Sequence, residues 1–129
     1  MQEARHDISD AEELDRLRAA LSAAGDVAYE WDLAADSIKW SGDVHKAFGI
    51  TDGPVPVSGA EFNLIVAQED IAARSNFLTR IQAGESQYEC EYRLQLPGDG
   101  ESWVHDRASV EFDNTGQAVR LVGILRFRS

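Results

Sequence analysis

The last third of the chain alternates between apolar and polar residues with the period of a β-strand. In residues 88–96 every second side chain is apolar, and those between are glutamate, arginine or glutamine. This alternation places the apolar side chains on one face of a sheet. Two further runs, 102–112 and 119–127, follow Gly- and Asp/Asn-containing turns at 97–100 and 113–116. Because short turns join antiparallel neighbours, the pattern predicts a three-stranded meander with one face to be covered.

The N-terminal segment has the period of a helix instead. We expect a polar, frayed end over residues 1–8 and an amphipathic helix over residues 9–25. Its apolar stripe is narrow and consists of Leu14, Leu17 and Leu21, which are three and four residues apart. Such a stripe suits packing against the same helix of a second copy, or against the protein's own sheet. The sequence leaves both alternatives open.

The middle of the chain predicts two strands followed by several helices. Residues 27–33 alternate, and a second strand contains Ile38 and Trp40. Ser41 is positioned to cap a short helix that ends at Gly49. Ser58 and Glu61 have the spacing of a capping box before the next helix. A longer helix is expected at about 69–83, with an apolar stripe formed by Ile71, Leu78 and Ile81.

This order of elements and its short motifs resemble a PAS domain, specifically the bacterial sensory subclass similar to PAS fold 3. The motifs are Trp-Asp-Leu (31–33), Ile-Lys-Trp-Ser (38–41), Phe-Gly-Ile (48–50), Glu-Asp (69–70), Glu-Tyr-Arg (91–93), Asp-Gly-Glu-Ser-Trp (99–103), Asp-Asn-Thr-Gly (113–116) and Val-Arg-Leu-Val-Gly (119–123). The resemblance implies an α+β fold over residues 26–129. Its five-stranded antiparallel sheet would have the order 2-1-5-4-3, with helices over one face and the N-terminal helix flanking it.

The chain departs from the family pattern at two places. Ala67-Gln68 stand where the family usually has His-Pro, and the last strand ends in Phe127-Arg128-Ser129 where the family usually has Asp-Ile-Thr. The second difference alters the usual polar hinge to an output domain. We expect a sensory domain excised from a multidomain signalling protein.

Composition and charge narrow the function classes. The chain has 129 residues, a formal net charge of −11, a sequence pI of about 4.5 and one cysteine. A strongly acidic chain without a basic run opposes binding to nucleic acid or to anionic membranes. A single cysteine excludes an internal disulfide and a cysteine-based metal cluster, and suits the cytoplasm. No phosphate loop or nucleophile elbow is present, so we predict that the domain is not an enzyme and has neither catalytic nor metal-binding residues.

The residues do not favour haem or flavin as a cofactor. The helix expected at 69–83 contains no haem ligand. The resemblance implies that flavin chemistry would use a cysteine on the helical side, whereas Cys90 lies within a strand between two glutamates. We interpret it as a small buried side chain. His45 and His105 are interpreted as surface residues, and Glu91 with Arg93 as a solvated ion-pair face.

An unidentified small ligand remains an option, in a pocket between sheet and helices. The candidate lining residues are Tyr29, Trp31, Phe62, Leu78, Tyr88, Tyr92 and Leu121. The simpler interpretation, which the sequence favours, is that these side chains only fill the core.

Two functional hypotheses follow. The first is a sensory and dimerisation module that regulates a linked output domain. The resemblance implies that this output is a two-component histidine kinase, or a cyclic-di-GMP cyclase or phosphodiesterase. The homodimer would form through Leu14, Leu17, Leu21 and the exposed sheet face. The alternative is a docking module that recruits a regulatory protein without sensing a ligand.

Overall fold

The computed structural model describes residues 2–96 and 100–128. They form one antiparallel sheet of five strands in the order β2-β1-β5-β4-β3, which confirms the predicted topology. Part of the turn expected at 97–100 lies outside the described residues. The elements are α1 (Gln2–Ala24), β1 (Asp26–Asp32), β2 (Ser37–Ser41), α2 (Val44–Phe48), α3 (Gly59–Asn63), the 3-10 helix η1 (Gln68–Asp70), α4 (Ile71–Gln82), β3 (Gln87–Leu96), β4 (Gly100–Phe112) and β5 (Ala118–Arg128).

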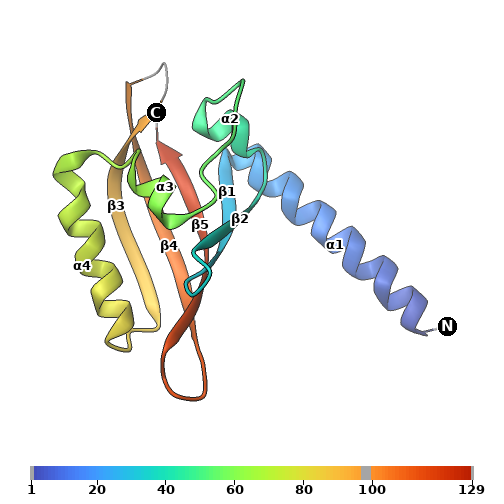
Figure 1. Ribbon diagram of the computed structural model, residues 1–129. Coiled ribbons are helices and arrows are strands. Elements are labelled where there is room, and N and C mark those ends of the chain that lie inside the picture. The colour runs from blue at the N-terminus through green and yellow to red at the C-terminus, as the bar shows by residue number, and fades with distance from the viewer. Residues whose placement is uncertain (1, 97–99, 129) are drawn as a thin grey trace.

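The helices α2, α3 and α4 cover one face of the sheet, while α1 projects away from the body of the protein (Figure 1). The core therefore lies between the covered face and these three helices. We call the covered face the inner face and the opposite one the outer face. The strands alternate as the sequence predicts: β3 buries Tyr88, Cys90, Tyr92 and Leu94 while its intervening residues are exposed or half-buried.

One position in the centre of the sheet requires glycine. Gly123 on β5 pairs with Ala108 on β4 across the longest strand pair. A Cβ atom at Gly123 would lie 2.4 Å from the carbonyl oxygen of Arg107 and 2.7 Å from the Cβ of Ala108. These separations are shorter than van der Waals contact, so a larger residue would push β4 and β5 apart.

Two of the expected helix boundaries differ from the structure. The first helix begins at Gln2, so residues 2–8, expected to lie outside it, are helical; good helix formers such as Glu3 and Ala4 continue the helix. Ser41 does not cap α2, because it is the last residue of β2 and the cap position falls on Asp43. The capping box at α3 is confirmed: the hydroxyl of Ser58 accepts a hydrogen bond from the amide of Glu61 at 3.0 Å.

The buried stripe of α4 also differs from the expected one. Ile81 is buried, whereas Ile71 is 38 % exposed. Ile71 occupies the first turn, where the chain leaves η1 and has not yet reached the core. Its place in the stripe is taken by Arg74, which is only 5 % exposed although it carries a charge. This arginine has a central part in the site below.

The N-terminal helix does not cap the inner face of its own sheet. Its contacts with the body are mainly with β1, where the helix ends. Leu14 and Leu17 are 53 % and 54 % exposed, and Leu21 is half-buried. Among the described residues, none of the helices combines the length and the apolar character needed to cross a membrane.

Candidate functional site

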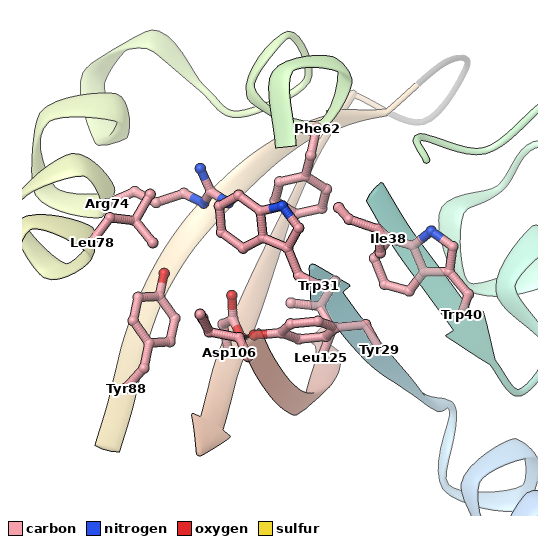
Figure 2. Close-up of a pocket in the computed structure, with 11 residues that line it drawn as sticks. Tyr29, Trp31, Ile38, Trp40, Phe62, Arg74, Leu78, Tyr88, Asp106 and Leu125 are labelled. Atoms are coloured by element: carbon pink, nitrogen blue, oxygen red, sulfur yellow. Dashed lines mark hydrogen bonds between the residues drawn. The ribbon is translucent and has the colours of Figure 1, made fainter. Parts of the chain in front are cut away.

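A small cavity of about 20 Å³ lies between the inner face of the sheet and α4 (Figure 2). This space corresponds to one or two water molecules. Its walls are mainly aromatic and aliphatic, but they include one acidic and one basic side chain. The lining residues are Tyr29, Trp31, Ile38, Trp40, Phe62, Arg74, Leu78, Tyr88, Asp106, Leu121 and Leu125.

Asp106 is the acidic residue of the cavity and is 4 % exposed. Alternation along β4 directs its side chain inward. Its two carboxylate oxygens accept hydrogen bonds from the hydroxyls of Tyr29 on β1 and Tyr92 on β3, at 2.6 Å and 2.8 Å. Burial raises the pKa of Asp106, whereas these two hydrogen bonds and the charge of Arg74 act in the opposite direction. Three strands thus meet at one buried carboxylate.

Arg74 is the basic residue and reaches the cavity from α4. Its Nη1 donates a hydrogen bond to the side-chain oxygen of Asn63. Its guanidinium carbon lies 5.0 Å from the ring centre of Phe62, 5.7 Å from that of Trp31 and 5.8 Å from that of Tyr92, which are cation–π distances. Burial lowers the pKa of Arg74. This effect is outweighed by the interactions with Tyr92, Tyr88 and Asp106, so the pKa is raised. The arginine is therefore held as a buried cation.

Two buried polar atoms of this cluster have no hydrogen-bond partner in the described part of the chain: Nε of Arg74 and the hydroxyl of Tyr88. Both residues line the cavity. Burial is also the main cause that raises the pKa of Tyr88, so its hydroxyl keeps its proton. An unpaired buried donor costs about 1–3 kcal/mol. Two such donors facing one cavity indicate a site for an oxygen acceptor, which a water molecule or a ligand could supply.

Trp31 is fixed at the edge of the cavity by a short network. Its indole N–H donates to Asp36 at 2.9 Å, and the same carboxylate accepts the backbone N–H of Gly59 at 2.7 Å. A Cβ atom at Gly59 would lie 2.5 Å from the Trp31 ring. The glycine therefore lets the start of α3 approach the indole, and Asp36 holds both in place.

The cluster is suited to binding rather than to covalent chemistry. Both oxygens of Asp106 are already engaged by tyrosines, and Arg74 has no free base beside it. Cys90 is buried, and burial raises its pKa to about 11, so the thiol is protonated near neutral pH. The described residues contain no group of three histidine, cysteine, aspartate or glutamate side chains that could hold a metal ion.

The structure brings most of the proposed pocket residues together. Tyr29, Trp31, Phe62, Leu78, Tyr88 and Leu121 line the cavity, and Tyr92 adjoins it through its bond to Asp106. Sequence reasoning missed both charged members, Arg74 and Asp106. Each had a visible signal: Asp106 is an acidic residue at an inward position of an alternating strand. Arg74 lies three and seven residues from Ile71 and Ile81, on the predicted helical stripe.

The outer face carries exposed charges and a few apolar side chains. His105 lies 2.8 Å from Glu89, and Arg128 pairs with Glu91 at 2.9 Å. The sequence predicts an ion-pair face shared by Glu91 and Arg93. In the structure, however, Arg93 pairs with a different carboxylate. It donates through Nε and Nη2 to Asp70 at 2.8 Å and 3.0 Å, because η1 brings this carboxylate to the edge of β3.

The family of the chain follows from comparison with known proteins. The family model described as PAS fold (PAS_3) matches residues 37–125, and the chain belongs to this family. No curated protein matches the sequence. The structure is similar to a sensory box histidine kinase/response regulator from Burkholderia thailandensis, with a TM-score of 0.72 and 21 % identity over 87 % of this chain and 83 % of the other.

Two further solved structures show the same fold. The N-terminal domain of a diguanylate cyclase with PAS/PAC sensor from Marinobacter aquaeolei has a TM-score of 0.65 and 20 % identity, over 78 % of this chain and 92 % of that one. A PAS domain of a protein from Colwellia psychrerythraea has a TM-score of 0.62 and 17 % identity, over 88 % and 94 %. The chain is a member of a sensory and regulatory fold family.

Proposed function

We propose that this chain is the sensory module of a signalling protein, and that it binds a small molecule in the Arg74–Asp106 cavity. The observation that supports this function best is the pair of unpaired donors, Arg74 Nε and Tyr88 hydroxyl, that face the cavity. A core that only filled space would not be expected to leave two such groups buried without partners. Native mass spectrometry of the freshly purified chain tests the idea, and a bound small molecule is the expected result.

The linked output domain is proposed from the proteins in which similar structures occur. Similar solved structures belong to a sensory box histidine kinase/response regulator and to a diguanylate cyclase with a PAS/PAC sensor. We therefore propose a histidine kinase or an enzyme of cyclic-di-GMP turnover as the output, a cyclase or a phosphodiesterase. The ligand would act by changing how this module packs against the linked output domain.

The signal would pass through a homodimer formed by α1. Leu14 and Leu17 are more than half exposed on a helix that projects from the body, as Figure 1 shows. Pairing of this helix with that of a second copy would bury the stripe of Leu14, Leu17 and Leu21. In sedimentation experiments, Leu17→Glu and Leu21→Glu should lower the apparent mass. Leu64→Glu, at an exposed leucine at the end of α3, is the matched control. Unchanged association of the α1 variants would remove this helix from the interface.

Docking of a partner protein is the second candidate. Trp103, Val122 and Ile124 are each more than 40 % exposed on the outer face, among charged neighbours. Apolar side chains inside a charged rim suit recognition of a protein surface. A core without any bound molecule, together with loss of partner binding in Val122→Glu and Ile124→Glu, would favour docking over sensing.

A further inference from the structure

The cavity presents hydrogen-bond donors but little net charge. Arg74 contributes a positive charge and Asp106 an opposing carboxylate, whose two oxygens already accept the hydroxyls of Tyr29 and Tyr92. The remaining donors are Arg74 Nε–H and the Tyr88 O–H, on side chains that are 5 % and 3 % exposed. An entering oxygen acceptor would satisfy both. A second carboxylate would be placed near Asp106 and repelled by it, so an uncharged head group matches the site better.

A larger hollow adjoins the cavity on the side of α3 and α4. It has a volume of about 340 Å³ and shares Trp31, Leu78 and Leu121 with the cavity. These three side chains therefore form the wall between the two spaces. Figure 2 shows Leu78 below Arg74 on α4, beside the space that the tyrosine hydroxyl of Tyr88 faces.

The wall has one fixed and one adjustable part. Asp36 and the close approach of Gly59 hold the Trp31 ring in place. Leu78 is only half-buried and lines both spaces, so it is the part of the wall that a change of rotamer can displace. A change of its rotamer would open a passage from the cavity to the hollow. Beyond the passage, the apolar side chains of Leu33 and Ile81 line the hollow together with the polar side chains of Asp36, Asn63 and Gln82.

We propose that the cavity and the hollow form a single binding site for an uncharged amphiphile. Its carbonyl or hydroxyl oxygen accepts hydrogen bonds from Arg74 Nε–H and the Tyr88 hydroxyl, and its short apolar chain passes Leu78 into the hollow. The inference rests on the proposed sensing function and adds the chemical class of the ligand. The combined space is of the size used for small-molecule sites, about 300–1,000 Å³.

The proposed ligand class is tested with two probes, hexanamide and hexanoate. They have the same chain length and differ in head-group charge. Titration of the full chain can be followed by NMR through the indole N–H of Trp31. Hexanamide should shift this resonance to saturation and bind about tenfold more tightly than hexanoate. Equal or tighter binding of hexanoate would overturn the uncharged head group, and absence of any saturable shift with hexanamide would overturn the site.

Two variants test where the head group and the apolar chain of the ligand bind. Tyr88→Phe removes a hydroxyl that has no partner in the free protein, so the fold should be kept while hexanamide binds about fivefold more weakly, as expected for one hydrogen bond. Leu78→Ala should strengthen binding of hexanamide and leave acetamide, which lacks the chain, unchanged. Unaltered affinity in Tyr88→Phe would overturn the head-group site, and an equal gain for both amides would overturn the passage.

The native mass spectrum separates this inference from the function on which it rests. A co-purified molecule together with failure of hexanamide would overturn the ligand class and leave sensing in place. Absence of any co-purified molecule, of any probe binding and of any effect of the α1 leucine variants on association would overturn the sensing function itself.

Discussion

The two faces of the sheet use charge in opposite ways. On the inner face, Asp106 and Arg74 are about 95 % buried and are held by tyrosine hydroxyls and aromatic rings. On the outer face, residues such as Arg120, Glu30 and Glu111 pair at the surface with about half of each side chain exposed. Alternation along the strands directs Asp106 inward and Glu111 and Arg120 outward, whereas Arg74 reaches the inner face from α4.

The difference shows that the number of ion pairs says little about which charges contribute to the stability of the fold. A surface pair gains little, because water already solvates both partners. A buried charge depends entirely on its partners, because nothing replaces them when one is removed. Burial of charges on the inner face therefore has a stability cost, which the surface pairs of the outer face do not have.

The largest effect is expected at Asp106. Asp106→Ala leaves Arg74 buried without its countercharge and two tyrosine hydroxyls without their acceptor, so the free energy of unfolding should fall by about 3–5 kcal/mol. Urea denaturation measures it. Glu111→Ala, on the outer face of the same strand, is the control and should cost less than about 1 kcal/mol. Equal losses in the two variants would remove the distinction between the faces.

A double variant sharpens the same comparison. Asp106→Leu combined with Arg74→Met replaces both buried charges by apolar groups, and it should recover part of the stability that Asp106→Leu alone loses. If the double variant is no more stable than the single one, the loss comes from the tyrosine hydroxyls and not from the uncompensated arginine.

The inner face is also expected to be intolerant of added volume. Gly123→Ala brings a Cβ atom against the Arg107 carbonyl and Ala108, and should lower the free energy of unfolding by about 1–3 kcal/mol. Val122→Ala, the neighbouring outward residue, should change it by no more than about 0.5 kcal/mol. Thermal or urea unfolding of both variants measures the difference, and a neutral Gly123→Ala would mean that β4 and β5 can separate without loss.

Much of the fold could be predicted from the sequence because the strands alternate so regularly. The sheet order followed from the family resemblance, and the Ser58 capping box from two residues of the right type and spacing. Ser41 could not be excluded as a cap, because hydrogen bonding in β2 decides where that strand ends. Such competition depends on neighbouring strands that local patterns do not describe.

The charged half of the site was harder to predict. The tyrosines were named as pocket residues because aromatic side chains on an apolar face are expected in a core. Arg74 and Asp106 were not, because a buried charge is rare and its partners come from distant elements. Asp106 meets Tyr29 from 77 residues away. Only the folded arrangement shows that the two charges share one cavity.

The pH dependence of stability should differ in sign between Asp70 and Asp106. Hydrogen bonds from Arg93 are the main cause that lowers the pKa of Asp70, so its contribution is present above about pH 4 and is lost as the pH falls below the unfolded value of 3.8. The raised pKa of Asp106 has the opposite effect, because its contribution is lost as the pH rises above 3.8.

Substitution of each carboxyl by an amide tests this sign. Asp70→Asn should lose less stability than the unmodified chain between pH 5 and pH 2.5, and Asp106→Asn should lose more. Urea midpoints measured across this range give the slopes. A change in the same direction for both variants would contradict the opposite pKa shifts of Asp70, which is held by Arg93, and of Asp106, whose pKa is raised by burial.

The smallest effect is expected from Arg120 on the outer face. Its side chain is 47 % exposed and lies 2.9 Å from Glu30 and 3.3 Å from Glu111. Arg120→Ala should lower the free energy of unfolding by about 0.2–1 kcal/mol. At about 1 M salt, where the screening length is about 3 Å, this cost should shrink toward zero, while that of Asp106→Ala should persist because no salt reaches it. A cost of Arg120→Ala that does not depend on salt would show that its aliphatic stem, and not its charge, stabilises the outer face.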